Sequence, residues 1–335
     1  MRKLTLIGTA LLIAISSYAG GLLTNTNQHI AFLRMIARGA SLQIDGVYSN
    51  PAGVAFMDNG LYFSLNGQSA YQTRNIDATF GLFPEKTRRY KGTAAVPIIP
   101  SAYVVYKHDN WALSGFIGVV GGGGKASFDD GLPMFDSRII EGIYAASHNT
   151  ITPDMYTINS SVSGRQFIYG AQLGLSYRLN KYLSVFGGGR MDYFSGNYSG
   201  YATAKLKANS ATLTNVELDC DQTGWGITPI IGVDYKNGKW NVGVKYEFGT
   251  NLNIENTTKK NSDPDGTLAD YKDGVNTPND IPSLLTVAVG YQFTSRLRAT
   301  AEYHFYDDKH VPSLRYEKAS VLLHRHLATR KKTKI

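Results

Sequence analysis

The fold is decided by alternating stretches such as residues 240–249, which read WNVGVKYEFG. Every second position from Trp240 to Phe248 is apolar, and the positions between are small or polar. Successive side chains of a β-strand point to opposite faces, so this stretch predicts a strand with one apolar face. The same alternation recurs at residues 167–177, 285–293 and 297–305.

Nine such strands are expected, and their connections alternate in length. The predicted strands are residues 61–73, 99–107, 111–120, 164–179, 182–196, 225–236, 239–252, 284–293 and 296–307. Tight turns are predicted at Asp109-Asn110, Asn180-Lys181, Asn237-Gly238 and Thr294-Ser295. Long polar connections are predicted at about 75–98, 121–163, 197–224 and 253–283. Short turns at one rim and long loops at the other are typical of bacterial outer-membrane barrels.

The two faces of the predicted strands differ as a membrane wall requires. Aromatic residues flank the turns on the apolar face, namely Tyr103, Trp111, Tyr177, Tyr235 and Phe293. The opposite face carries charges that would be costly in lipid but are solvated in a lumen, among them Arg190, Asp192, Asp234, Lys245 and Glu247. We therefore predict an all-β, antiparallel up-and-down transmembrane barrel. A secreted β-sandwich also alternates, but its strands average only about 5–6 residues.

The first 59 residues lack this alternation. Arg2 and Lys3, an apolar stretch at 4–15 and Ser17-Tyr18-Ala19 predict a signal peptide over residues 1–19. Residues 20–59 are predicted to form a plug, with helical spacing at 31–44, ahead of a partial barrel at 60–308. The chain is thus expected to be exported to the outer membrane of a Gram-negative bacterium, where lipid and lipopolysaccharide surround it.

The net charge of +8 does not indicate nucleic-acid binding, because it belongs to the two ends. The signal contributes +2 and residues 309–335 contribute +7, which leaves the body near neutral. The single Cys220 excludes an internal disulfide framework, and its neighbours Asp219 and Asp221 predict an exposed loop.

Nine is an odd number of strands, whereas a closed bacterial barrel has an even number. Residues 309–335 form a basic tail without strand alternation or a terminal aromatic residue. We expect this tail to reflect a truncated or frame-shifted product of a longer gene.

Residues 39–55 contain Asn50-Pro51-Ala52-Gly53 just before the first predicted strand. This segment resembles the N-terminal hatch of FadL-type long-chain fatty-acid transporters, a family that also carries aromatic hydrocarbons. The resemblance covers about residues 20–308 and implies a 14-stranded barrel, of which about nine strands are present. It also implies passive uptake of a hydrophobic small molecule, most readily a fatty acid, with release sideways through the wall.

The resemblance implies three sets of site residues. Gly121, Gly122, Gly123 and Gly124 are candidates for the lateral opening, with a flexible exit from a strand as the alternative. The candidates for a ligand groove in an apolar loop helix are Leu132, Met134, Phe135, Ile139, Ile140 and Ile143. That helix can equally pack on its own barrel rim. Arg190 and Lys245 are candidates for pairing with a ligand carboxylate, although salt bridges to Asp192, Asp234 or Glu247 are favoured.

Other functions are less favoured by the residues. A general porin or a surface adhesin would share the barrel, but a plug would block an aqueous pore. Gly121–Lys125 fails as a phosphate loop, because Val119 and Ala126 stand where the motif needs Gly and Ser or Thr. We expect no enzyme activity, no catalytic residues, no cofactor and no metal, and a monomer that binds no nucleic acid.

Overall fold

The computed structural model describes residues 27–263 and 268–307. Its main strands are β1 (Gly60–Thr79), β2 (Thr87–His108), β3 (Trp111–Phe128), β4 (Tyr156–Arg178), β5 (Leu183–Leu206), β6 (Thr212–Asn237), β7 (Trp240–Glu247), β10 (Leu284–Gln292) and β11 (Arg298–Tyr306). Shorter elements are α2 (Ile30–Arg34), α3 (Gly46–Ser49), η2 (Pro51–Phe56), α4 (Pro133–Ala146), η3 (Pro153–Met155), β8 (Asn253–Asn261), η4 (Ala269–Tyr271) and β9 (Asn276–Pro278). The predicted signal peptide and the basic tail lie outside the described residues.

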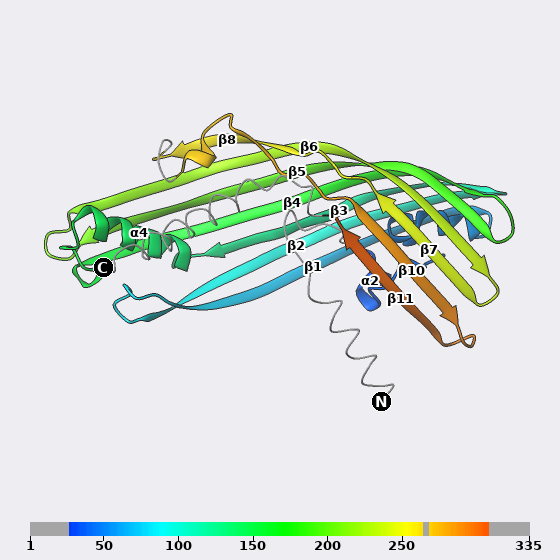
Figure 1. The fold of residues 1–335 in the computed structure, drawn as a ribbon, viewed down its shortest axis with the longest axis horizontal. Coiled ribbons are helices and arrows are strands. Elements are labelled where there is room, and N and C mark those ends of the chain that lie inside the picture. Colours follow the sequence, from blue (N-terminus) through cyan, green and yellow to red (C-terminus); the bar gives the residue numbers. More distant parts are fainter. Residues whose placement is uncertain (1–26, 264–267, 308–335) are drawn as a thin grey trace, which may run out of the picture.

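The nine main strands form one curled antiparallel sheet in chain order (Figure 1). Each strand pairs with the next, from β1–β2 to β10–β11. β8 pairs with the outer part of β6, and β9 pairs with β8. Within the described residues β1 and β11 form the two edges, so the sheet is a half-barrel. The predicted fold class and the count of nine strands are confirmed.

The strands β1 to β6 are longer than predicted, because much of the predicted long loops is strand, whereas β7, β10 and β11 are shorter than predicted. β4, β5 and β6 have 23, 24 and 26 residues. The predicted loop at 197–224 is a continuation of β5 and β6 that turns only at residues 207–211. The tight turn at Asn237-Gly238 forms as predicted, with Gly238 at a φ of +56° that favours glycine.

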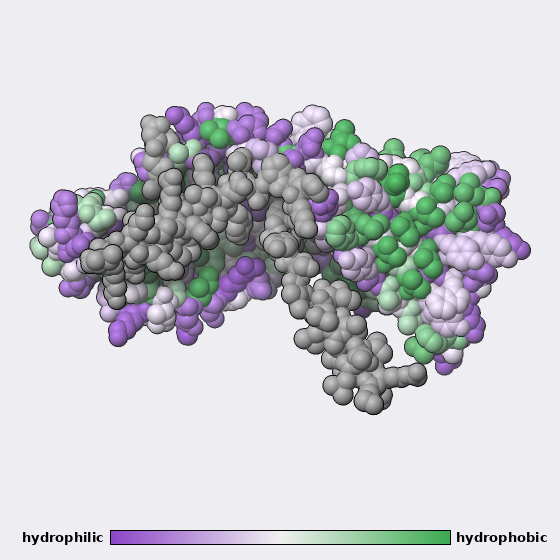
Figure 2. Space-filling view, viewed as in Figure 1, coloured by the Kyte–Doolittle hydropathy of each residue, from purple (hydrophilic) through white to green (hydrophobic). Residues whose placement is uncertain are grey.

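The sheet is apolar outside and polar inside. Leu173 and Trp225 project outward and are 62% and 66% exposed, whereas Asp192, Asp234 and Lys245 point inward and are buried. Hydrophobic residues gather over the end of the molecule that carries β7 and β10 (Figure 2). A soluble sheet would bury its apolar face, so this inverted arrangement indicates a wall that faces lipid.

Two side chains lie elsewhere than predicted. Tyr103 faces inward and is fully buried, and its hydroxyl donates to Asn27 Oδ1 at 2.6 Å. Cys220 is a buried inward residue of β6 and not part of an exposed loop. In both cases local polarity does not show which way the side chain faces: Cys220 stands between Asp219 and Asp221 within β6, and Tyr103 stands between Ala102 and Val104 within β2.

Residues 27–59, called the hatch here, lie against the inner face of the sheet. The helix predicted over 31–44 is reduced to α2, and the segment that follows is mostly turns. Val47, Tyr48 and Val54 of the hatch pack with inward wall residues that include Phe116 and Ile168. This apolar cluster is the main core of the described chain.

Candidate functional site

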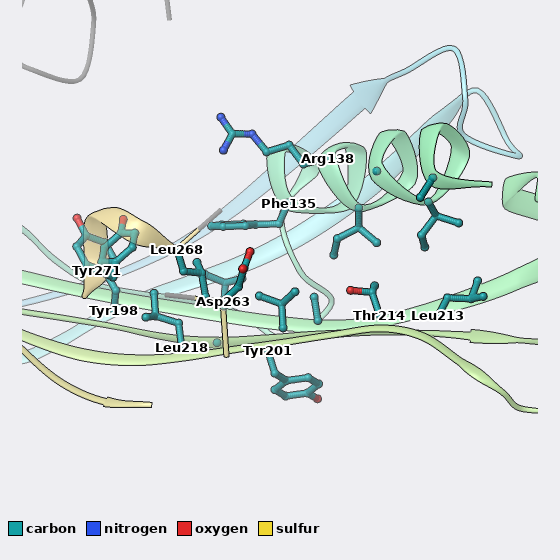
Figure 3. A pocket seen from close by; sticks show the side chains of 18 of the residues that line it. Phe135, Arg138, Tyr198, Tyr201, Leu213, Thr214, Leu218, Asp263, Leu268 and Tyr271 are labelled. Carbon is teal, nitrogen blue, oxygen red and sulfur yellow. The ribbon is translucent and has the colours of Figure 1, made fainter. Parts of the chain in front are cut away.

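An apolar cavity of about 540 Å³ lies between α4 and the inner faces of β4, β5 and β6 (Figure 3). From α4 it is lined by Phe135, Ile139 and Ile143. From the sheet and the segment before η4 it is lined by Val162, Tyr198, Gly200, Ala202, Val216, Leu218, Leu268 and others. A cavity of this volume and lining fits a small hydrophobic molecule.

Two charged residues, Arg138 and Asp263, are among those that line this cavity. Figure 3 shows the guanidinium of Arg138 pointing away from the space between α4 and the sheet. The hydroxyl of Tyr198 is hydrogen-bonded to Gln166, and its ring packs edge-on against Tyr271 with centroids 5.8 Å apart. The lining between α4 and the strands is therefore mainly apolar.

Helix α4 is held over the sheet by one buried carboxylate, Asp136. Its Oδ2 accepts a hydrogen bond from Tyr90 at 3.1 Å and pairs with Arg88 at 2.9 Å. Its Oδ1 accepts from Ser160 at 2.9 Å. Burial raises the pKa of Asp136 despite these partners. The anchor joins α4 to β2 and β4 and so sets the height of the cavity roof.

The six predicted groove residues divide into three groups. Phe135, Ile139 and Ile143 line the cavity, and Ile140, which is not part of the lining, is buried in a cluster with Tyr90. Leu132 is the N-cap of α4, and Met134 is 56% exposed. The helix packs on the rim and also roofs the cavity, and the role of these residues in binding a ligand stays a prediction.

The cavity residues of β5 and β6 were missed from the sequence. They lie at residues 198–218, which were assigned to a loop. Their signal was the continued alternation of inward Tyr198, Gly200, Ala202 and Ala204 with more polar neighbours.

Wall side chains hold the hatch by its backbone carbonyl groups. Gln172 Nε2 donates to Val47 O at 2.7 Å, and Lys245 Nζ donates to Tyr48 O at 2.9 Å. The carbonyl groups of Pro51 and Ala52 are held in the same way. Ser176 Oγ donates to Pro51 O at 2.6 Å, and Ser184 Oγ donates to Ala52 O at 2.7 Å. The inward polar face is therefore largely buried against the hatch and not solvated as the sequence suggested.

Asn50 is the most strongly held residue of the hatch motif. Its Nδ2 donates to Asp234 Oδ2 at 2.6 Å and to Ser41 O at 3.0 Å. Asn241 Nδ2 is the second donor to the same Asp234 oxygen, at 2.9 Å. Gly53 fits closely beside this contact, since a Cβ there would lie 2.8 Å from Ser41 O. The motif thus needs Asn for the bond and Gly for the space.

Arg190 and Lys245 form a buried ion network below the hatch. Arg190 pairs with Asp192 at 2.8 Å and with Glu247 at 2.7 Å, and Lys245 pairs with Glu247 at 2.5 Å. Both cations also lie over the ring of Tyr48. These are the salt bridges that the sequence favoured. Nη1 of Arg190 has no hydrogen-bond partner in the described residues, and its pairing with a ligand carboxylate stays a prediction.

The ladder between β2 and β3 is interrupted at the four-glycine stretch. Residues 95–100 of β2 and 119–125 of β3 are unpaired with each other, although the β2–β3 ladder is formed on both sides of this gap. The β3–β4 register also shifts between Val119 and Gly124. Gly122 and Gly124 have φ of +99° and +73°, which explains the glycines. Gly121–Gly124 lie within β3 and not in a strand-to-loop exit.

Other kinds of site are not indicated in the described residues. In 27–263 and 268–307 no group of three or more His, Cys, Asp or Glu side chains is placed to hold a metal ion. No helix in the same ranges is both long and apolar enough to cross a membrane.

Comparison with known proteins places the fold. A FadL homologue from Pseudomonas aeruginosa superposes with a TM-score of 0.57 at 14% identity, over 86% of this chain and 70% of that one. The toluene transporter TodX from Pseudomonas putida gives a TM-score of 0.51 at 17% identity, over 81% and 67% of the two chains. No family model and no curated protein matches the sequence. The chain therefore has the fold of FadL-type outer-membrane transporters.

Proposed function

We propose that this chain serves in the outer membrane of a Gram-negative bacterium as a channel for passive uptake of long-chain fatty acids or similar hydrophobic small molecules. The observation that carries the proposal is the apolar cavity under α4, at the end of the sheet opposite the tight turns. Transfer of an acyl chain from water into such a space is favourable by about 0.8 kcal/mol per methylene. The cavity is thus suited to capture the ligand outside the cell.

Sideways release through the wall is supported by where the ladder is interrupted. The cavity lining reaches Val162, whose ladder partner on β3 is Phe128. Gly124, at the edge of the unpaired stretch, is four residues further along β3. Pro97 and Pro100 stand opposite in β2 and lack the N–H groups that would close the ladder. An apolar ligand leaving here would enter the bilayer directly.

Movement of the hatch is the proposed step between capture and release. The hatch is held by side-chain hydrogen bonds and packing, and none of residues 27–59 belongs to a strand of the sheet. The hatch can shift without breaking the ladders of the wall.

A general porin is a weaker candidate, because Val47, Tyr48 and Val54 fill the space against the wall. Low conductance of the reconstituted protein would agree with the channel for hydrophobic ligands, and large open currents would favour the porin.

Uptake of radiolabelled oleate and toluene by cells that lack their own hydrophobic-compound channel tests the proposal. Cells that express the chain should accumulate at least one of the two compounds faster than cells with an empty vector. The proposal is refuted if expressing cells and empty-vector cells accumulate each compound equally fast while an antibody shows the protein to be in the outer membrane.

A further inference from the structure

A row of polar side chains crosses the outer face of the wall on four neighbouring strands. Lys125 of β3 pairs in the ladder with Arg165 of β4, which pairs with Asn197 of β5. Asn197 pairs in turn with Asp221 of β6. We call these four residues the outer polar row. Arg165 shares the outward face of β4 with exposed Tyr169 and Leu173, whereas Ile168 between them is buried.

The outer polar row lies just above the level of the membrane. On β4 the outward residues from Tyr177 to Phe167 are apolar, and Arg165 follows directly. The ten steps from Tyr177 to Phe167 span roughly 33 Å along the strand, or about 25 Å along the membrane normal at the usual tilt. That is the height of the apolar band of outer-membrane barrels. Tyr169, Tyr193 and Trp225 are ladder neighbours near its upper edge, as interfacial aromatics should be.

Lys125 and Arg165 have one carboxylate near them in the described residues, since Asp221 interacts electrostatically with Arg165. Both cations are exposed, they stand directly opposite each other, and neither forms an ion pair within the described residues. Like charges opposite each other on neighbouring strands are destabilising. Asp221, the acidic member of the row, is paired with Lys259 at 2.7 Å and accepts from Asn197 at 2.8 Å. Asp221 thus interacts with both Lys259 and Arg165, and Lys125 faces the outer leaflet without an ion pair in the described residues.

A second row, of hydroxyl groups, runs one step further from the membrane. Thr93, Ser127, Ser163 and Ser199 are consecutive ladder partners on β2 to β5. The hydroxyls of Ser163 and Ser199 lie 2.9 Å apart, so both half-buried groups share one face. Hydroxyls can both donate to and accept from the hydroxyls of a sugar.

We propose that Lys125 and Arg165 bind the phosphate of an anionic glycolipid of the outer leaflet, whose sugar contacts the hydroxyls of Ser127 and Ser163. The two cations supply charge-assisted hydrogen bonds to phosphate oxygens. The apolar wall directly below the row accommodates the acyl chains, which singles out a lipid over a soluble phosphate. This site lies on the opposite face of the wall from the cavity and beside the interrupted β2–β3 ladder.

The test uses the full chain, freed of native lipid and placed in nanodiscs with bis-phosphorylated lipid A. Lipid retained on the protein is counted by native mass spectrometry for wild type and for the double variant K125Q/R165Q. The matched control is K181Q/K239Q, which removes the same charge at the opposite rim. A charge-conserving variant, K125R/R165K, shows whether positive charge at these two positions suffices for binding. For every variant, folding is checked by heat-modifiable gel mobility, which should be unaltered.

Loss of the two cations should weaken lipid A binding about 30-fold, roughly fivefold for each. The control and the charge-conserving variant should bind like wild type, and dephosphorylated lipid A should bind weakly to all. The proposal is overturned if K125Q/R165Q binds like wild type, if K181Q/K239Q loses binding equally, or if the phosphate makes no difference.

Discussion

Replacing Asn50 with aspartate tests how the hatch is held. In the structure Asn50 Nδ2 donates to Asp234 Oδ2 at 2.6 Å, and Asp234 is fully buried. The variant removes this donor and sets a second carboxylate against the first. Asn50→Ala is the matched control, because it removes the donor without adding a charge.

The size of the effect follows from the geometry. Two carboxylates that relax to about 4 Å apart repel by about 4 kcal/mol at an effective dielectric constant of 20. A lost hydrogen bond to a charged group adds about 1.5–3 kcal/mol. The free energy that docks the hatch should therefore fall by about 5–7 kcal/mol in Asn50→Asp at neutral pH, and by only the second amount in Asn50→Ala.

Amide hydrogen exchange of residues 46–56, followed by mass spectrometry, measures this docking. Protection should decrease from wild type to Asn50→Ala to Asn50→Asp at pH 7, while the exchange of β4 to β6 stays unchanged. Acidification should restore protection in Asn50→Asp relative to wild type at the same pH, because one shared proton removes the repulsion. If both variants exchange like wild type at every pH, the contact with Asp234 does not hold the hatch.

Three further predictions concern the cavity, the wall and the anchor of α4. Phe135→Ala should weaken binding of a fluorescent fatty acid about ten- to a hundredfold, since burying an aromatic side chain contributes about 1.5–3 kcal/mol. Replacement of the adjacent, exposed Met134 by alanine should leave the affinity unchanged. Equal affinities of Phe135→Ala and wild type would exclude the cavity as the binding site. Gly123→Trp should slow ligand uptake in cells without unfolding the protein, because a Cβ at this position meets no atom within 4 Å. Gly187→Trp, in equally open space on β5, is the control. Uptake that Gly123→Trp leaves unaffected would argue against release at this point. Burial raises the pKa of Asp136 above its value in the unfolded chain. Between these two pKa values the folded state binds more protons than the unfolded state, so the stability of the protein declines as pH rises through this range. The difference in Tm between wild type and Asp136→Asn should therefore fall as pH rises above about 4, and a difference that grows with pH would contradict this sign.

The membrane half of each strand could be predicted because its chemistry is two-sided. From Trp225 to Tyr235 every outward residue is apolar, and turn residues mark the end at Asn237-Gly238. Beyond the membrane both faces of a strand meet water, protein or polar groups, so the contrast between faces disappears. At Asn197 to Ala204 small and polar residues alternate weakly, and the strand was mistaken for a loop. The number of strands survived this error, because the tight turns define the hairpins.

The candidate site could be predicted only in part, for a geometric reason. Apolar residues at 139, 140 and 143 indicate a helix that buries something, but consecutive helical positions point about 100° apart. Ile139 faces the cavity and Ile140 faces Tyr90, and only the position of α4 over the sheet separates them. The residues opposite, such as Tyr198 and Leu268, are brought there by pairings of strands far apart in the chain.

The way the hatch is bound is compatible with its proposed movement inside a wall whose ladders stay intact. Gln172, Ser176, Ser184 and Lys245 are wall residues whose side chains donate to hatch carbonyls, while their own backbones remain within the sheet. Each neutral bond of this kind contributes about 1 kcal/mol net, because water can replace the partner on both sides. Asp234 differs, because its charge is buried and water does not reach it while the hatch is in place. Opening should therefore depend less on the neutral donors than on how readily Asp234 is hydrated, and the Asn50 contact is the one whose loss admits that water.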